Sequence, residues 1–279
     1  MTIHPPPPPP PGFHTAPRIP WDELDPGVRE RVEDTIGAVD EAATVWAGFS
    51  CDLAAALGTV RGCFFAKGVH GGHPAVAQQR VEAAVAPYVT ALSPRLVDHI
   101  SACDWDVLLF EYVDAVHADL SPGSPDLPRV AEALCTLGRL GTPARALPLD
   151  RVADRWADRL DATALALLDG DSLLHTDLNP HNLLSGGGRA YVVDWATAAR
   201  GPAWLDVAQA ALRLMEQGHT ADDAEAWARQ IPCWRGITTD QFDALVTASL
   251  RAWESSDAFD DARCCSARLL ALGGVPRDP

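Results

Sequence analysis

The chain has 279 residues, 47% of them hydrophobic and 22% charged, which is typical of a globular protein with a large core. A net charge of −16 argues against DNA or RNA as a partner, because an acidic protein repels polyanions. No apolar run reaches the ~18 residues that span a membrane, and the start of the chain lacks a basic region followed by an apolar one. We therefore expect a cytoplasmic protein with no nucleic-acid or membrane partner, and the oligomeric state stays open.

The cysteine pattern favours neither a zinc site nor a disulfide framework. Seven cysteines are present, and none of them follow the spacing C-x-x-C. We expect them to be small core residues in a reducing compartment.

The first 20 residues are predicted to be a disordered proline-rich tail outside the fold. Pro5–Pro11 are seven consecutive prolines, which cannot join a helix or a sheet and favour an extended polyproline form. A flexible tail is the first interpretation, and binding to an aromatic groove on a partner is the alternative.

Residues 21 to 113 show helical and strand patterns. A helix is expected from Trp21 to about Val39, with Asp22 or Asp25 as its cap. The further expected elements are strands over 44–49, 53–59 and 63–69, a helix over 75–89, and a buried strand over 106–113.

Lys67 stands out because it is the only lysine in the sequence, against 21 arginines. It lies in one of the apolar strands, where a charge needs a specific reason. A compact ammonium group and a fork-shaped guanidinium are not interchangeable where a point charge must reach phosphate oxygens. We therefore expect Lys67 to contact a phosphorylated ligand, with a lysine at a strand edge as the alternative.

The chain after residue 113 is predominantly helical in pattern. Gly218 and Pro232 mark breaks between helices. The expected helices cover 128–140, 150–168, 207–216, 221–230, 238–254 and 260–272.

The stretch from Leu173 to Trp195 has the pattern of a phosphoryl-transfer site. His175, Asp177 and Asn182 follow the spacing H-x-D-x-x-x-x-N, and Asp194 comes twelve residues later. Asp177 suits the base beside an attacking hydroxyl, while Asn182 and Asp194 suit oxygen ligands of Mg²⁺. A Gly-rich turn between two short strands is expected to bring Asn182 and Asp194 together.

Other interpretations of this stretch remain open. An acid, an amide and two histidines also occur in structural loops. His175, Asp177 and His181 are alternatively the ligands of a zinc or iron hydrolase, because imidazole and carboxylate suit both metals.

The sequences HTDLNPHNLL and VVDW resemble the catalytic signature of the aminoglycoside phosphotransferase and choline kinase family. The resemblance implies an α+β, two-lobed, protein-kinase-like fold. Its N-lobe is a small antiparallel sheet over 21–113 and its C-lobe is larger and helical over 114–279. Thr176 follows His175 and Trp-Ala follows Asp194, which departs from protein kinases, so no activation-loop arginine switch is expected.

The resemblance also assigns roles to residues of the site. His175 and Asp177 are then the catalytic residues, and Asp206, in GPAWLDVA, braces the catalytic loop. The residues expected to bind ATP or GTP are Lys67, its partner Glu82, Ser50 in the phosphate-covering turn, and the carbonyl of Glu111 with the amide of Val113 in the hinge.

The expected activity is phosphoryl transfer from ATP (or GTP), with Mg²⁺, to a hydroxyl of a small-molecule acceptor. The acidic charge favours a cationic antibiotic such as an aminoglycoside, with Glu254 and Asp257 near its site, which implies antibiotic resistance. Surface acids that only maintain solubility are the alternative for this charge. The alternative functions are a catalytically inactive nucleotide-binding protein and a kinase of an amino alcohol, sugar or nucleoside.

Overall fold

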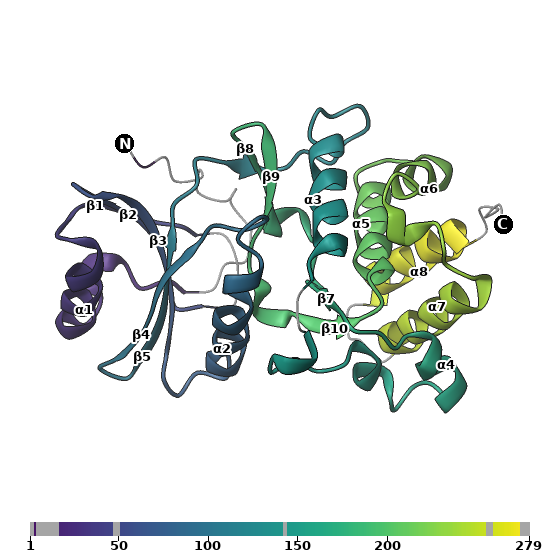
Figure 1. The fold of residues 1–279 in the computed structure, drawn as a ribbon, viewed down its shortest axis with the longest axis horizontal. Helices are drawn as coiled ribbons and strands as arrows, with labels where there is room; N and C mark the ends of the chain where they lie inside the picture. The colour runs from purple at the N-terminus through teal and green to yellow at the C-terminus, as the bar shows by residue number, and fades with distance from the viewer. Residues whose placement is uncertain (1–2, 4–16, 47–50, 142–143, 255–258, 274–279) are drawn as a thin grey trace.

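A five-stranded sheet and a group of helices lie at opposite ends of an elongated molecule (Figure 1). The computed structural model describes residue 3 and residues 17–46, 51–141, 144–254 and 259–273. The predicted α+β, two-lobed architecture is therefore confirmed.

The N-lobe sheet is antiparallel throughout, with the strand order β1-β2-β3-β5-β4. Alternate residues of the central strands face α1, and the buried side chains of Val28, Val32 and Ile36 pack against that face. The strands are β1 (Val39–Thr44), β2 (Leu53–Thr59), β3 (Gly62–His70), β4 (Leu96–Ala102) and β5 (Trp105–Glu111).

Helix α1 (Pro26–Ile36) begins after Asp25, one of the two predicted caps, and not at Trp21, where the predicted helix starts. Asp25 is its N-cap and accepts a hydrogen bond from the N–H of Gly27 at 2.8 Å, and Pro26 occupies the first turn. The packed segment begins earlier than predicted, because Arg18 is buried and the N–H of Ile19 donates to the carbonyl of Asp52. Residues 4–16, which include the proline run, lie outside the described part.

Two predictions for the sheet differ from the structure. The first strand is Val39–Thr44, ahead of the predicted strand over 44–49, of which residues 47–49 lie outside the described part. This edge strand carries exposed acids instead of the apolar residues that marked the prediction. The sequence analysis missed β4, whose tight turn to β5 consists of Cys103 and Asp104, both at positive φ and without glycine.

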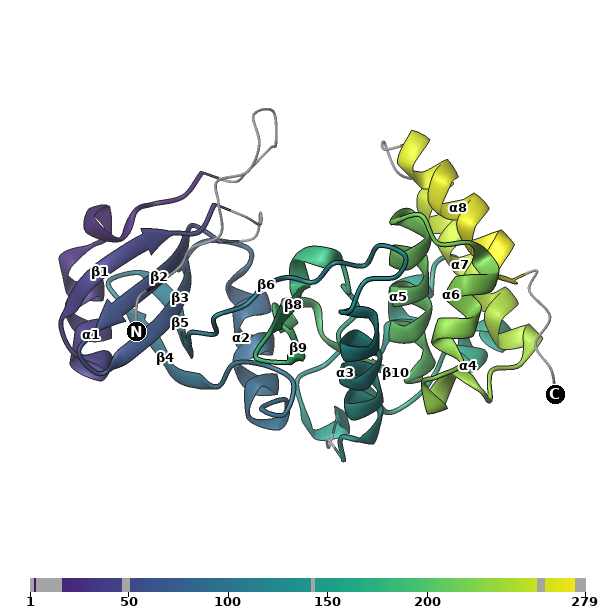
Figure 2. The ribbon, with the colours of Figure 1, turned by 90° about the horizontal axis from the view of Figure 1, so that it is seen from above.

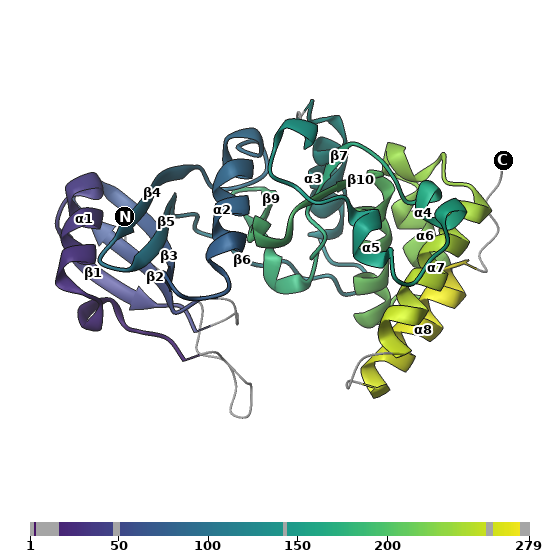
Figure 3. The ribbon, with the colours of Figure 1, turned by 90° about the horizontal axis from the view of Figure 1, so that it is seen from below.

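Helix α2 (Val76–Val85) lies between the N-lobe sheet and the rest of the molecule, as Figures 2 and 3 show from two sides. It begins one residue after the start of the helix predicted over 75–89 and ends earlier, at Val85. Its last turn and the residues after it belong to the C-lobe core, because Val85, Val89 and Leu92 pack into that cluster.

Helices and short β-hairpins form the C-lobe. The predicted Gly-rich turn joins β8 to β9 through Gly187 and Gly188, both at positive φ as such a turn requires. The elements are β6 (Val116–His117), α3 (Leu127–Arg139), α4 (Ala162–Leu167), β7 (Ser172–Leu174), β8 (Leu183–Gly186), β9 (Arg189–Val192), β10 (Ala199–Gly201), α5 (Trp204–Glu216), α6 (Ala221–Ala228), α7 (Thr239–Glu254) and α8 (Phe259–Gly273).

The helices after Asp206 agree with the prediction, whereas the single helix over 150–168 does not form. The chain makes a short 3₁₀ helix, η4 (Val152–Trp156), and then α4. A turn over residues 157–160 separates them, and the side chain of Asp161 then caps α4 through the N–H of Ala164. Within the described residues, no helix is both long enough and apolar enough to cross a membrane.

Candidate active site

The loop that follows β7 is held by a buried carboxylate from α5. Asp206 is 1% exposed and accepts hydrogen bonds from the N–H groups of His175 at 2.7 Å and Thr176 at 2.9 Å. Complete burial raises the pKa of Asp206 above its usual range, although His175 and these hydrogen bonds oppose the shift. The bracing role that the resemblance implied for Asp206 agrees with this geometry.

Thr176 adopts an unusual backbone conformation, with φ at +66°. A β-branched residue in the left-handed region costs about 1–3 kcal/mol, so the surrounding structure must hold it there. Its hydroxyl donates to the carbonyl of Thr197 at 2.6 Å and accepts from the guanidinium of Arg155 at 3.0 Å. The strained residue immediately before Asp177 is thus fixed on several sides.

His175 supports the loop from within the core. Its side chain is fully buried, and its Nδ1 accepts the N–H of Asp177 at 3.2 Å. Nε2 therefore carries the proton and donates to the carbonyl of Val193 at 2.9 Å. His175 was predicted to be a catalytic residue, and this stays a prediction; in the structure its ring is buried, with both nitrogens engaged.

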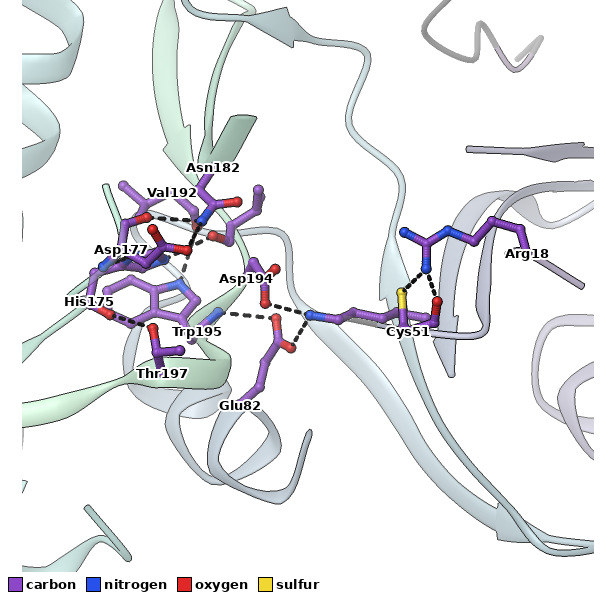
Figure 4. Close-up of polar contacts among 12 residues, drawn as sticks. Arg18, Cys51, Glu82, His175, Asp177, Asn182, Val192, Asp194, Trp195 and Thr197 are labelled. Atoms are coloured by element: carbon purple, nitrogen blue, oxygen red, sulfur yellow. Dashed lines mark hydrogen bonds and ion pairs between the residues drawn. The ribbon is translucent and has the colours of Figure 1, made fainter. Parts of the chain in front are cut away.

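Asp177 and Asn182 are in direct contact. The side-chain amide of Asn182 donates to the Asp177 carboxylate at 3.0 Å and to the Asp177 carbonyl at 2.9 Å (Figure 4). Asn179 donates to the other carboxylate oxygen, also at 3.0 Å. The carboxylate of Asp177 is therefore held by two amides, and its conformation is defined.

A buried ion-pair network joins the two lobes. The ammonium group of Lys67 on β3 lies 2.8 Å from Glu82 on α2 and 2.6 Å from Asp194 after β9. Burial opposes the charge of Lys67, but the two carboxylates outweigh it and raise the pKa of Lys67. Burial also disfavours a charged Asp194, yet Lys67 holds the pKa of Asp194 below its usual range. The predicted pairing of Lys67 with Glu82 is present, and Asp194 completes the network.

Asp194 and Trp195 connect this network to the C-lobe. Asp194 has φ at +65°, which turns the chain sharply after β9. The N–H of Trp195 donates to Glu82 at 3.3 Å, and its indole N–H donates to Ser93 at 2.7 Å. Glu82 therefore contacts the N-lobe lysine through one oxygen and the C-lobe backbone through the other.

The donor set around Asn182 and Asp194 fits Mg²⁺. The amide nitrogen of Asn182 is directed at Asp177, so its oxygen is the atom on the opposite side, and Asp194 supplies carboxylate oxygens (Figure 4). Among the described residues, no group of three or more His, Cys, Asp and Glu side chains is arranged to hold a metal ion. Mg²⁺ bound through one or two carboxylate or amide oxygens with substrate phosphates needs no such cluster, whereas the zinc or iron hydrolase does.

The remaining predicted nucleotide contacts lie at the ends of the N-lobe elements. Ser50 lies outside the described residues. Strand β5 ends at Glu111, and Val113 follows in the connection to the C-lobe, where the hinge was expected. The carboxylate of Glu111 pairs with Arg95 at 2.7 Å, which leaves the predicted role to its main-chain carbonyl.

A cavity of about 360 Å³ lies beside the catalytic loop in the C-lobe. Thr176 and Asp206 form the wall next to Asp177, and α5, α7, α8 and η4 form the others. Its charged and polar lining consists of Arg155, Thr176, Asp206, Gln209, Arg213, Glu216, Ser249 and Cys265.

Sequence reasoning missed several residues that support the site. Gln209 donates to the carbonyl of Thr176 at 2.9 Å and accepts the N–H of Leu178 at 3.4 Å. Arg155 and Ser93 hold Thr176 and Trp195 from distant parts of the chain. Of these residues, only Gln209 could have been found from the sequence. It follows Asp206 by three residues, and residues three apart share a helix face, so it was a candidate to contact the same loop.

Comparisons with known proteins agree with this geometry. Residues 136–245 match the model of the phosphotransferase enzyme family. The sequence matches none of the curated proteins with which it was compared.

Solved structures of similar fold include an aminoglycoside phosphotransferase from Alicyclobacillus acidocaldarius, at 16% identity and a TM-score of 0.60, covering 94% of this chain and 96% of that one. Aminoglycoside phosphotransferase APH(4)-Ia, in ternary complex with ADP and hygromycin B, matches at 16% identity and a TM-score of 0.57, covering 89% of this chain and 99% of that one. The choline kinase LicA from Streptococcus pneumoniae matches at 13% identity and a TM-score of 0.55, with 89% and 98% covered.

Proposed function

We propose that this chain, whose residues 136–245 match the model of the phosphotransferase enzyme family, is a small-molecule kinase that transfers the terminal phosphoryl group of ATP or GTP to a hydroxyl of a small acceptor. The observation that carries the proposal is that two groups of residues are linked where β9 ends, because the N–H of Val193, next to Asp194, donates to the carbonyl of Asn182 at 3.0 Å. The Lys67–Glu82–Asp194 network comes from both lobes, and the Asp177–Asn182 pair lies in the catalytic loop.

In the proposed reaction, each residue acts through the geometry that holds it. Lys67 orients the nucleotide phosphates, and Glu82 keeps its ammonium group in place. Asp177 accepts the proton of the acceptor hydroxyl while the oxygen forms a bond to the terminal phosphorus. The bond to the bridging oxygen breaks, and the nucleoside diphosphate leaves. Asn182 and Asp194 would hold Mg²⁺, which supplies positive charge that stabilises the transferring phosphoryl group.

The main contribution of the protein is then positioning and charge stabilisation. Asp177 makes no covalent bond to phosphorus in this scheme. The side-chain amides of Asn179 and Asn182 and the braced loop hold its carboxylate in one orientation before the acceptor arrives. This preorganisation supports an active enzyme over a catalytically inactive relative.

For the acceptor, we propose a hydroxylated cation such as an aminoglycoside or a related antibiotic. Support comes from the net charge of −16 and from a structural relative crystallised with hygromycin B. The cavity beside the loop has a volume within the range of about 300–1,000 Å³ that is common for small-molecule sites. Within the wall of the cavity, Arg213 pairs with Glu216 at 2.8 Å, so these two charges balance. The proposed preference for a cation therefore rests on the electrostatic field of the whole protein.

The test is incubation of the purified protein with Mg²⁺, radiolabelled ATP or GTP, and a panel of hydroxylated acceptors. The panel includes aminoglycosides, choline, sugars and nucleosides, and labelled products are separated and identified. Transfer to an aminoglycoside supports the complete proposal. Transfer to a neutral metabolite retains the kinase and refutes the cationic acceptor. Nucleotide binding without transfer to any acceptor, and without slow ADP release, favours the inactive alternative.

A further inference from the structure

One side chain, that of Gln209 on α5, holds both peptide units that flank Asp177. Its amide nitrogen donates to the carbonyl of Thr176 at 2.9 Å, and its amide oxygen accepts the N–H of Leu178 at 3.4 Å. The amide orientation follows from these partners, because a carbonyl can only accept and an N–H can only donate.

All four polar backbone atoms of these two peptide units are engaged. His175 accepts the N–H of Asp177, and Asn182 donates to the carbonyl of Asp177. Gln209 engages the other two atoms. Since the peptide units set the direction of the side chain between them, the Asp177 carboxylate is oriented through Gln209 as well as through its direct contacts.

Gln209 is attached to a rigid support. It lies on α5, three residues after Asp206, and Asp206 fixes the preceding N–H groups of the loop. The same face of α5 packs into the C-lobe core through Leu205 and Ala208. One helix face therefore holds the loop from His175 to Leu178.

We propose that Gln209 is a positioning residue that orients Asp177 for proton transfer by fixing the segment Thr176–Leu178 against α5. This inference rests on the proposed kinase function and assigns a role to a residue outside the catalytic motif. Because Gln209 also lines the cavity beside the loop, it is in the wall that an acceptor in this cavity would contact.

The test compares Gln209→Met and Gln209→Glu with wild type and with Gln217→Met. Methionine has a similar length to glutamine and forms neither hydrogen bond. Gln217 is an exposed residue at the C-terminal end of the same helix, so its substitution is the matched control. The probe is Mg-ATP with water as the acceptor, and the readouts are ADP release, the KM for ATP and the melting temperature.

We expect Gln209→Met to lower kcat for ADP release by about 10- to 100-fold, the scale of a misplaced catalytic group. The KM for ATP should stay within about twofold of wild type, because no nucleotide contact is proposed for Gln209, and Gln217→Met should change neither constant. A kcat within twofold of wild type would overturn the inference. The inference would also be overturned if Gln209→Met raised the KM for ATP in proportion to a fall in the melting temperature. That result would indicate a general loss of stability and not a specific effect on Asp177.

Gln209→Glu supplies a pH-dependent readout. An ionised glutamate accepts the N–H of Leu178 but cannot donate to the carbonyl of Thr176, whereas a protonated carboxyl group can do both. The charged or titratable groups that share the cavity with this position are Asp206, Arg213 and Glu216 on α5, Arg155 on η4 and Cys265 on α8.

The ratio of variant to wild-type kcat should therefore rise as the pH falls, and a ratio that stays constant with pH contradicts the inference. If wild type binds neither ATP nor GTP and releases no nucleoside diphosphate from either, the proposed function fails and the inference fails with it. If wild type is active and both Gln209 variants keep its rate and pH profile, only the inference fails.

Discussion

At the scale of single residues, the site depends on contacts between distant parts of the chain, such as that of Lys67 with Glu82. Glu82 was the only acid on its predicted helix, and it does pair with Lys67. The burial of His175 could not be predicted from the sequence, because it depends on α5 and on the chain near Val193. The positive φ of Thr176 was equally hidden, since threonine is a poor left-handed residue and only its tertiary partners hold it there.

Replacement of Asp177 by Asn should lower turnover by at least ~100-fold, the usual contribution of a general base. The amide keeps the shape of the carboxylate but cannot accept the hydroxyl proton. Steady-state kinetics with an identified acceptor measures the effect, and calorimetry should show nearly unchanged ATP binding. Asp40→Asn, which neutralises an exposed acid on β1, is the control. Retention of most activity by Asp177→Asn would remove Asp177 from the mechanism.

Replacement of Asp194 by Ala should abolish Mg²⁺-dependent nucleotide binding. The variant loses the carboxylate proposed to hold the cation, and it also removes one of the two partners of Lys67. Titration calorimetry with ATP, in the presence and absence of Mg²⁺, separates the two effects. An unchanged Mg-ATP affinity would show that the metal assignment is wrong.

Lys67→Arg should impair turnover although the charge is conserved. The ammonium group lies between two carboxylates at 2.8 and 2.6 Å, and its side chain is only 8% exposed. A planar guanidinium does not fit this space without displacing its partners. The comparison variant is Arg80→Lys on the exposed side of α2, and full activity of Lys67→Arg would contradict the argument.

At the scale of elements, the prediction succeeded where apolar periodicity coincides with burial. Helices α5 to α8 and strand β3 have this property. It failed for β1 and β4, which form the two edges of the sheet and carry exposed polar residues among their apolar ones. Edge strands are paired on one side only, so their sequences are less constrained by the core than those of central strands.

The cap of α1 provides a test of this helix as an element. Asp25→Ala should lower the free energy of unfolding by about 1 kcal/mol, because the N–H of Gly27 loses its acceptor. Urea denaturation followed by circular dichroism measures the change. The control is Asp22→Ala, an exposed acid in the preceding 3₁₀ helix, which should have little effect. Equal effects of both substitutions would exclude Asp25 as the specific cap.

At the scale of the molecule, the two lobes do not divide at one point in the chain. The predicted N-lobe over 21–113 includes Val85, Val89 and Leu92, which pack into the core of the C-lobe. Glu82 lies just before this segment. A movement of the sheet relative to the helices would therefore separate Lys67 from Glu82 and Asp194, whereas Glu82 would remain with the C-lobe.

The acidic charge of the whole molecule leads to a test of the acceptor. Neutralisation of Glu254 and Asp257 together should raise the KM of a cationic acceptor and leave that of ATP unchanged. Asp257 lies outside the described residues, and α7 ends at Glu254. The rate with the cation should also fall between low and physiological salt, because screening limits the field to ~10 Å. A rate that is insensitive to salt would refute the cationic acceptor while the kinase assignment stands.

Lys67 supplies the only side-chain amine of the protein, and it lies inside the ion-pair network. An acylating reagent attacks only an uncharged and accessible amine, and both conditions fail while the two carboxylates hold the ammonium group. Acylation of this side chain is thus possible only in molecules whose network has opened. The rate at which the mass of the peptide that contains Lys67 increases therefore measures how often the network opens. No label has to be introduced, and no other lysine competes for the reagent.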